Sequence, residues 1–102
     1  MIVTVFRSRL NPAAQEEYGA MAADMSALAR EIPGYVSHKG FVAEDGERVT
    51  IVEFASEAAL QAWKRHPAHI EAKKLGFTKF FSAFSYQVCS VVHARAWTGR
   101  AG

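Results

Sequence analysis

Hydrophobic side chains recur along the chain at spacings that change from one segment to the next. Residues 2–10 are rich in β-branched and aromatic types, which is typical of a strand. In the segment that follows, Asn11 is expected to cap a helix that Pro12 begins. Apolar side chains at steps of three and four residues predict that this helix buries one face, made of Tyr18, Met21, Ala22, Met25, Leu28, Ala29 and Ile32.

The centre of the chain has the pattern of a β-hairpin. Pro33-Gly34 ends the first helix, and the apolar and β-branched residues of 35–42 and 48–54 predict a strand in each segment. Asp45-Gly46 lies between them and is a dipeptide favoured in tight hairpin turns. These segments therefore predict two antiparallel strands that are adjacent in the sheet.

The C-terminal part of the chain combines a broken helix with a long strand. We expect Ser56 to cap a second helix and Gly76 to end it. Pro67 cannot donate a backbone hydrogen bond and disfavours helical geometry in the residue before it, so this helix is expected to be kinked or in two pieces. Residues 80–92 predict a final strand with one apolar face, made of Phe80, Phe84, Tyr86, Val88 and Val92.

The order strand-helix-strand-strand-helix-strand predicts an α+β fold of the ferredoxin-like, split βαβ kind. Both helices then cover one face of a four-stranded antiparallel sheet. The first and last strands nevertheless carry apolar side chains at both parities. A sheet that is apolar on both faces must bury the second one, so we expect a homodimer. The two sets are Val3, Val5, Phe81 and Val91 against Ile2, Phe6, Phe84 and Val88.

Composition and charge narrow the possible functions. The chain has 102 residues and a mass of 11.2 kDa, enough for one domain, which we place at residues 1–93 with an aperiodic tail at 94–102. Residues 1–93 hold ten Lys/Arg and ten Asp/Glu, so no nucleic-acid partner is expected. No apolar run approaches the roughly 20 residues of a membrane span and no leader opens the chain, so we expect no membrane partner and a cytoplasmic location. Cys89 is the single cysteine, which excludes an internal disulfide and favours a reducing compartment.

Four short stretches carry a resemblance to a known family. They are Pro33-Gly34-Tyr35, Glu53-Phe54, the run from Trp63 to His69, and the run from Gly76 to Tyr86. Over roughly residues 1–92 the sequence resembles the antibiotic biosynthesis monooxygenase family of dimeric α+β barrels. The resemblance implies a ferredoxin-like protomer whose sheet packs on its partner's sheet, with a pocket between sheet and helices. Similar proteins include oxygenases that form quinones from polycyclic phenols without metal or flavin, haem-degrading enzymes and signal-degrading enzymes.

The haem-degrading branch of the family implies residues that this sequence largely lacks. That branch uses an Asn on the first strand, a Trp on the second helix and an iron-ligating His about three turns after the Trp. Ser8, Trp63 and Lys73 stand at those positions here, and a protonated lysine has no lone pair for iron. Haem is therefore not expected, and His66 or His69 is the alternative ligand in a shifted geometry.

A metal site built on the two neighbouring histidines is not expected either. His66 and His69 are three residues apart, which places two ligands on one face of an unbroken helix, but Pro67 interrupts that helix. Only Glu71 lies close in sequence as a further ligand. The sequence therefore predicts neither a metal nor another cofactor.

The cofactor-independent branch implies a specific set of tasks for the protein. Its substrate is a phenol or anthrone whose anion gives an electron to O₂, so the protein binds a flat ring, removes one proton and excludes water. The candidates for accepting the proton or stabilising the phenolate are His66, Tyr86 and Arg9. His66 has an alternative role as a surface residue or as a substitute cap before Pro67, and Tyr86 as a dimer-interface residue.

Aromatic residues are the candidates for enclosing the ring. Trp63 is expected to stack on the substrate or, alternatively, to belong to the core. His69 is a second candidate of the same kind as His66. The further substrate-binding candidates are Phe6, Ser8, Phe41, Phe80 and Phe84.

Strand alternation leaves open which face of the first strand lines the pocket. Phe6 and Ser8 share one face, and Arg7 and Arg9 share the other. On the second strand His38 falls on the more apolar face, where a lone histidine is more typical of a structural residue than of a catalyst.

The function that the resemblance favours is a cofactor-independent monooxygenase that oxidises a small phenol, anthrone or quinol with O₂. The absence of a Gly-rich phosphate loop and of a nucleophile elbow argues against phosphoryl transfer and classical hydrolysis. One alternative is a non-catalytic dimeric module that binds a small hydrophobic ligand or haem. Another is a structural dimer whose pocket is filled by its own side chains.

Overall fold

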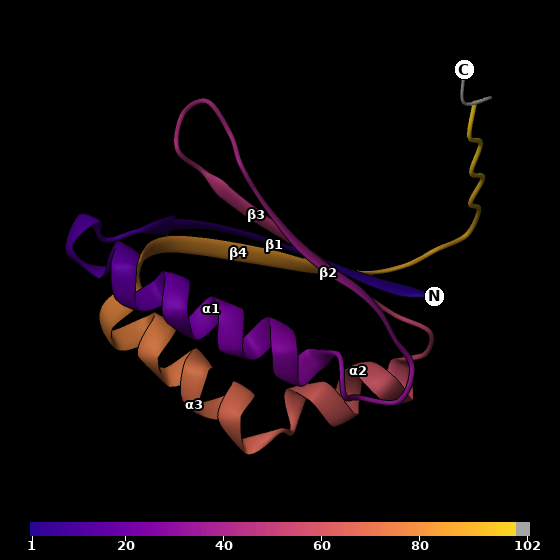
Figure 1. Cartoon of the computed structure of the whole chain (residues 1–102), viewed down its shortest axis with the longest axis horizontal. Helices are drawn as coiled ribbons and strands as arrows, with labels where there is room; N and C mark the ends of the chain where they lie inside the picture. The colour runs from indigo at the N-terminus through magenta and orange to yellow at the C-terminus, as the bar shows by residue number, and fades with distance from the viewer. Residues whose placement is uncertain (100–102) are drawn as a thin grey trace.

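The computed structural model describes residues 1–99, in which three α-helices pack against one face of a four-stranded sheet (Figure 1). This arrangement confirms the α+β, ferredoxin-like fold that the order of elements predicts. The last three residues of the predicted tail, 100–102, lie outside the described residues. In chain order the elements are β1 (Ile2–Leu10), the 3₁₀ turn η1 (Pro12–Ala14), α1 (Gln15–Ala29), β2 (Tyr35–Val42), β3 (Arg48–Phe54), α2 (Glu57–Lys64), α3 (Pro67–Leu75), the π-helical turn η2 (Gly76–Phe80) and β4 (Phe81–Ser90).

The register of the sheet decides which side chains face the helices. All neighbouring strands are antiparallel, in the order β2-β3-β1-β4. Phe6 in the middle of β1 lies opposite Thr50 of β3 and Tyr86 of β4, so these three side chains share one face. Helices α1, α2 and α3 all cover one face of the sheet (Figure 1). Val52, two residues from Thr50 and therefore on the same face of β3, packs in the core with residues of α1 and α2, so this is the face that the helices cover. Phe6 and Ser8 therefore face the helices, whereas Arg9 faces the other way, which answers the question that the sequence leaves open.

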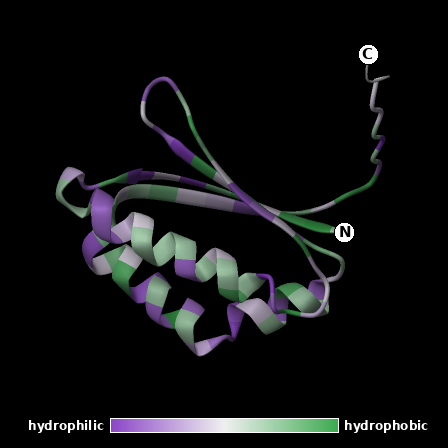
Figure 2. Cartoon of the chain, viewed as in Figure 1, coloured by the Kyte–Doolittle hydropathy of each residue, from purple (hydrophilic) through white to green (hydrophobic). Residues whose placement is uncertain are grey.

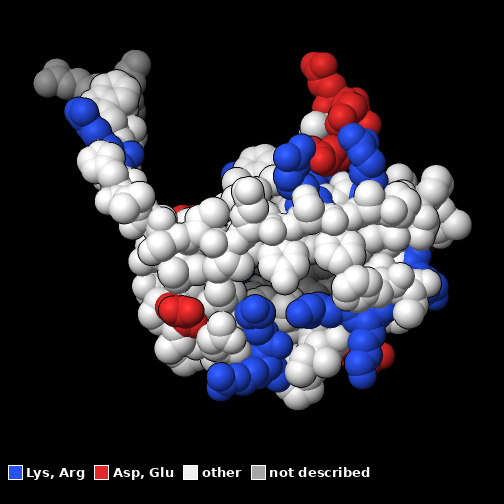
Figure 3. All heavy atoms as spheres, turned by 180° about the vertical axis from the view of Figure 1, so that it is seen from behind, with Lys and Arg blue, Asp and Glu red and all other residues white. Residues whose placement is uncertain are grey.

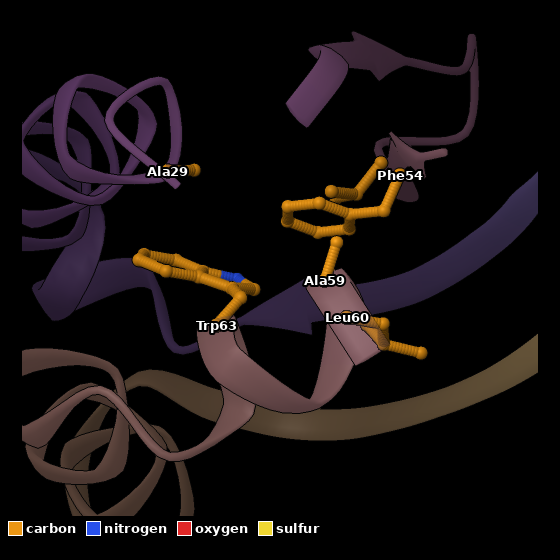
Figure 4. Close-up of a cluster of buried hydrophobic side chains, with 6 residues drawn as sticks. Ala29, Phe54, Ala59, Leu60 and Trp63 are labelled. Atoms are coloured by element: carbon orange, nitrogen blue, oxygen red, sulfur yellow. The ribbon is translucent and has the colours of Figure 1, made fainter. Parts of the chain in front are cut away.

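The hydrophobic core lies where α1 and α2 meet the end of β3 (Figure 4). Phe54 is fully buried and Trp63 is 4% exposed. Each such side chain stabilises the fold by about 1.5–3 kcal/mol through loss of apolar surface. Hydrophobic and hydrophilic residues alternate along α2 and α3, as expected of helices with one buried face (Figure 2). The cluster consists of Ala29, Val52, Phe54, Ala59, Leu60 and Trp63.

The first helix begins differently from the sequence-based prediction. Asn11 does not cap it with its side chain. Instead, Asn11 Nδ2 donates to the Lys79 carbonyl over 3.0 Å and Asn11 N donates to the Phe80 carbonyl over 2.8 Å. Pro12 begins a short 3₁₀ turn, and the α-helix starts only at Gln15. Asn11 thus joins the end of β1 to the turn that precedes β4, a tertiary contact that local sequence does not reveal.

The predicted break in the second helix is confirmed. Helix α2 begins after Ser56, whose Oγ accepts from Ala59 N over 3.2 Å, and ends at Lys64. Helix α3 begins at Pro67, and His66 Nδ1 accepts from the backbone N–H of the residue after that proline over 3.1 Å. His66 therefore serves as the cap of α3, the alternative role that the sequence suggests.

The end of α3 contradicts two expectations. Gly76 does not end the helical region, because the chain continues through the π-helical turn η2 to Phe80. Phe80 consequently precedes β4 and is 1% exposed, with its ring 5.8 Å from that of Tyr18. The expectation that Phe80 shares the apolar face of the last strand is therefore wrong. A π-helical turn, with hydrogen bonds from residue i to i+5, adds a residue to the helical turn and is rare in proteins.

The last strand is shorter than predicted, and one of its residues is on the other face. β4 ends at Ser90 instead of residue 92. A register shift between Arg9 and Leu10 inverts the alternation, so Phe81 contacts Phe6 on the helix side rather than sharing the face of Val3. The segment 91–99 forms no helix or strand and extends away from the sheet (Figure 1). Within the described residues, no helix is long and apolar enough to cross a membrane.

Candidate functional site

A cavity of about 620 Å³ lies between the helix-side face of the sheet and the three helices. Figure 3 shows a hollow on the face of the molecule that is opposite to the view of Figure 1. The size is that of a typical small-molecule site. Most of its lining is apolar and comes from every strand and α-helix; the larger members are Phe6, Met21, Met25, Val52, Leu60, Trp63, Phe81, Tyr86 and Val88.

Trp63 and His69 form the wall of the cavity on the side of α2 and α3. Their rings are stacked, with centroids 4.6 Å apart and planes 27° from parallel. The break at Pro67 starts a new helix, and in this arrangement His69 lies against Trp63 instead of continuing along α2. Among the described residues, His69 Nδ1 is buried and has no hydrogen-bond partner. A buried polar atom without a partner is unusual in native proteins, and this one is closed off from solvent in the present conformation.

His69 is held in its neutral form. Burial and, as the next largest cause, the positive charge of Lys73 lower its pKa from 6.5 to about 4. A backbone hydrogen bond with Lys64 acts in the opposite direction, while the charges of His66 and Lys64 add smaller decreases. The imidazole is therefore neutral at pH 7, which is the form that accepts a proton or a hydrogen bond.

A polar pair lies across the cavity floor on the sheet. Thr4 of β1 and His38 of β2 flank Val52 of β3 in the same row of the sheet, so all three face the helices. Thr4 Oγ1 is buried and also has no hydrogen-bond partner among the described residues. Burial lowers the pKa of His38; its own backbone opposes this decrease and the charge of Arg30 adds to it. The floor thus presents a hydroxyl and a neutral imidazole to the cavity.

The end of the cavity near the hairpin is lined by Tyr18 and Arg48. The guanidinium carbon of Arg48 lies 5.7 Å from the centroid of the Tyr18 ring, a cation–π arrangement. Burial raises the pKa of the Tyr18 phenol, whereas the charge of Arg48 and hydrogen bonding with Thr50 lower it. Tyr18 is therefore a neutral phenol at pH 7.

Comparison with known proteins identifies the family. A family model described as antibiotic biosynthesis monooxygenase matches residues 1–75. The chain belongs to the antibiotic biosynthesis monooxygenase family. Its sequence is similar to that of the uncharacterized protein YqjZ of Bacillus subtilis, with 28% identity over 78 residues that cover 76% of this chain and 68% of YqjZ.

Two solved structures illustrate how widely this family fold is shared. Rv0793 from Mycobacterium tuberculosis has a TM-score of 0.83 and 18% identity, covering 93% of this chain and 98% of Rv0793. SnoaB, a cofactor-independent oxygenase from Streptomyces nogalater, has a TM-score of 0.78 and 16% identity, covering 91% of this chain and 94% of SnoaB. At such low sequence identities these similarities establish a shared fold and not a shared function.

Within the family fold, the cavity brings together about half of the residues that the sequence suggests for the site. Trp63, His69, Phe6 and Tyr86 line it. Phe41 contributes only at the edge strand β2, because the register places it opposite Val49, on the face that points away from the helices. A smaller side chamber of about 150 Å³ adjoins the main cavity, and four residues line both spaces. The side chamber is lined by Phe6, Lys73, Phe77, Phe81, Phe84 and Tyr86.

Four of the suggested residues lie elsewhere. Arg9 projects from the opposite face of the sheet and pairs with Asp45, Nη2 to Oδ2 over 2.7 Å. His66 caps α3 and is not among the residues that line the cavity. Ser8 is on the helix side but buried at 3% exposure outside the lining, and Phe80 belongs to the packed interior.

Sequence reasoning did not single out three polar residues of the cavity as site residues. A lone histidine such as His38 on an apolar strand face is typical of a structural residue, and Thr4 and Arg48 belong to no motif. Strand alternation contains the missing information, because Thr4 has the parity of Phe6 and His38 follows from the hairpin register. Within residues 1–99 no group of three His, Cys, Asp or Glu side chains is arranged to hold a metal ion.

Proposed function

We propose that the chain is a cofactor-independent monooxygenase that oxidises a flat phenol, anthrone or quinol with O₂. The observation that carries the proposal is an apolar cavity in which two buried polar atoms, Thr4 Oγ1 and His69 Nδ1, have no hydrogen-bond partner among the described residues. Such atoms cost free energy unless a ligand pairs with them. The family membership supports the reaction class, as does the description of its structural relative SnoaB as a cofactor-independent oxygenase.

The ring of the substrate lies in the apolar part of the cavity. Trp63 and Phe81 supply flat or edge-on aromatic surfaces, and Met21 and Met25 of α1 adapt to the ring outline. Aromatic enclosure keeps bulk water from the reacting carbon and strengthens the few polar contacts that remain. Binding in this orientation leaves the phenolic or keto oxygen to pair with Thr4 Oγ1.

His69 accepts the proton in this proposal. Its lowered pKa keeps the imidazole neutral, so Nδ1 has a free lone pair when the substrate enters. The substrate anion that forms next to it stabilises the imidazolium, because an opposite charge at short range favours the charged form. The ion pair thereby drives a proton transfer that the isolated groups would not favour.

The oxidation needs only O₂ and the proton that the substrate has given to His69. The substrate anion gives one electron to O₂, and the substrate radical and superoxide combine into a new C–O bond. With an anthrone as the substrate, the peroxide takes back the proton from His69 and loses water together with the second hydrogen of the CH₂ group, which leaves a carbonyl at that carbon. One oxygen atom is then in the product and the other in water, so no external reductant is needed.

Oxygen uptake with an anthrone that carries a phenolic hydroxyl tests the proposal, measured against its uncatalysed autoxidation and alongside quinone absorbance. His69→Gln is expected to lower kcat by about 10²-fold, the usual contribution of a general base, and Trp63→Phe is expected to raise KM. His93→Gln, a change in the exposed C-terminal segment, is the control.

The variant His66→Asn, which keeps a capping side chain, separates the two histidines. A loss of kcat in His66→Asn but not in His69→Gln would restore His66 as the proton acceptor. Retention of the anthrone with no acceleration of O₂ uptake would contradict the monooxygenase proposal and favour the non-catalytic binding module.

We also infer a homodimer, formed through the sheet face that points away from the helices. Val3, Val5, Val49 and Ile51 lie on this face by the register of β1 and β3. No element among residues 1–99 covers them (Figure 1). Pairing two copies of this face would bury both. The cytoplasmic location that we expect from the sequence stays a prediction.

A further inference from the structure

The charged residues that line the cavity are all of one sign. Lys39, Arg48, Lys64 and Lys73 belong to the lining, together with two histidines, and none of the lining residues is Asp or Glu. The chain as a whole carries 12 Lys and Arg against 10 Asp and Glu, so this bias is local rather than a consequence of composition. Lys and Arg side chains border the hollow in Figure 3.

Two of these cations are close to the cavity wall that Trp63 and His69 form. Lys64 is in the last turn of α2, and Lys73 is on α3, one turn beyond His69. The charges of both ammonium groups act on the His69 ring and lower its pKa. Arg48 is placed against the Tyr18 ring, and the Lys39 ammonium lies 5.7 Å from the Phe41 ring. Lys64 and Lys73 are therefore the cations nearest to the His69 side of the cavity.

The carboxylates of the chain do not neutralise this pair. The ion pairs found within residues 1–99 join Arg7 to Glu47, Arg9 to Asp45 and Lys79 to Glu17. The first two lie on the far face of the sheet near the hairpin, and the third joins α1 to the π-helical turn. A cleft lined by charges of one sign between low-dielectric walls concentrates the field and attracts ligands of the opposite charge.

We propose that the cavity selects an aromatic substrate that carries a permanent carboxylate, held by Lys64 and Lys73 while the ring lies against Trp63. This inference rests on the proposed function and specifies its substrate class. A carboxylate is favoured over a phosphate because the surrounding walls are mostly apolar, and one negative charge costs less desolvation there than the nearly double charge of a phosphate monoester.

Lys73 has a second role in this arrangement. It lines both the main cavity and the side chamber, in which its neighbours are Phe77 and Phe84. These two rings meet edge to face with centroids 5.0 Å apart. A carboxylate at Lys73 therefore lies at the boundary between the two spaces, so a substrate with a short acidic side arm fits better than one with the acid on the reacting ring.

A matched pair of fluorescent probes tests the charge preference in the full chain without any turnover. Anthracene-2-carboxylate and anthracene-2-carboxamide have nearly the same shape and differ in charge, and their binding is followed by the anisotropy of the anthracene emission. At 50 mM salt the carboxylate is expected to bind about tenfold more tightly than the amide. At 0.5 M salt the ratio is expected to fall to about threefold, because counter-ions screen partly exposed charges.

Substitutions assign the preference to the two lysines. Lys73→Gln is expected to lower the carboxylate-to-amide ratio about threefold, and Lys64→Gln/Lys73→Gln to bring it close to one. Lys74→Gln is the matched control, because this neighbour on the same helix is exposed and does not line the cavity. Binding of the neutral amide should be the same in all of these variants.

The outcomes separate this inference from the proposed function. Equal affinities for the acid and the amide, or an equal loss of preference in Lys74→Gln, would overturn the carboxylate inference whether or not the chain oxidises neutral anthrones. A clear preference for the acid that depends on Lys64 and Lys73 supports it even if O₂ uptake is absent, in which case only the monooxygenase proposal fails. Competition by inorganic phosphate as strong as by the aromatic acid would overturn the assignment to a carboxylate.

Discussion

Two histidines three residues apart are in different environments because of the proline between them. Pro67 has no N–H and begins a new helix, so His66 before it has extended backbone geometry and its Nδ1 caps α3. His69 is the third residue of that helix and stacks on Trp63. The same residue type is therefore structural at one position and available to a ligand at the other. The sequence favoured His66 for catalysis because the burial of His69 by Trp63 cannot be derived from spacing.

The pH dependence of folding reports on His69. Its pKa is about 4 in the folded chain and 6.5 in the unfolded chain, so between these values only the unfolded chain gains a proton there. The stability therefore falls as the pH decreases from about 6.5 to about 4 and then levels off, by about 1–2 kcal/mol after allowance for solvent screening. Histidine NMR titrations and urea denaturation at pH 7.0 and 4.5 measure both quantities.

His69→Gln is expected to reduce this acid sensitivity, whereas His66→Asn retains it because His69 remains in place. The burial of His38 acts in the same direction, so part of the sensitivity persists in His69→Gln. An unchanged difference between the two pH values in His69→Gln would contradict the burial of a neutral imidazole at this position.

At the scale of elements, the confirmed predictions are those in which local chemistry and the tertiary structure agree. The Asp45-Gly46 turn joins β2 to β3, and Gly46 has the positive φ of 90° that this turn requires. The apolar stripe of the first helix faces the sheet, and Pro67 divides the second helix. Each of these features depends on residues within one or two turns of each other.

The predictions that failed at this scale depend on contacts between distant segments. Gly76 is a typical helix terminator, but it has helical geometry, and a Cβ atom there would lie 2.8 Å from the Phe81 ring. The glycine is needed for close packing, not for a left-handed turn. The side chain of Asn11 bonds to Lys79, 68 residues away. A sequence pattern contains no signal for either contact.

Gly34 and Gly46 allow backbone strain to be separated from crowding. Both have positive φ, 92° and 90°, but a Cβ atom on Gly34 would lie 2.7 Å from Ala59 Cβ, whereas one on Gly46 meets nothing within 4 Å. Gly46→Ala is expected to cost about 1–2 kcal/mol of stability from strain alone. Gly34→Ala is expected to cost about 1–3 kcal/mol more, because it also forces α2 away from the start of β2.

Urea denaturation of the two variants gives both free energies. Because Gly34→Ala moves α2, it should also weaken ligand binding at Trp63, while Gly46→Ala should leave binding unchanged. Equal losses of stability in the two variants would contradict the close contact between Gly34 and α2.

At the scale of the whole molecule, the sheet and the helices each supply a different kind of side chain to the cavity lining. The sheet supplies Thr4 and His38, α1 supplies methionines, and the broken second helix supplies Trp63 and His69. The sequence predicts part of the aromatic wall, since Trp63 and Phe6 are candidates for enclosing a ring and both line the cavity. The sequence could not predict that all charged residues of the lining are positive. Lys64 and Lys73 are on helices that also carry acidic residues, and only the packing of the helices decides which side chains face the cavity.

The face of the sheet that points away from the helices leads to the last prediction. Val5 lies at its centre, opposite Ile51 on β3 and Gln87 on β4. If two copies pair through this face, native mass spectrometry should give twice the 11.2 kDa mass of one chain. Val5→Glu would bury a carboxylate against its symmetry mate, at a cost of several kcal/mol, and is expected to give a monomer. Ala27→Glu, on the exposed side of α1, should remain dimeric. A wild-type monomer at micromolar concentration would contradict the homodimer and leave Val3, Val5 and Ile51 as an apolar surface in need of another partner.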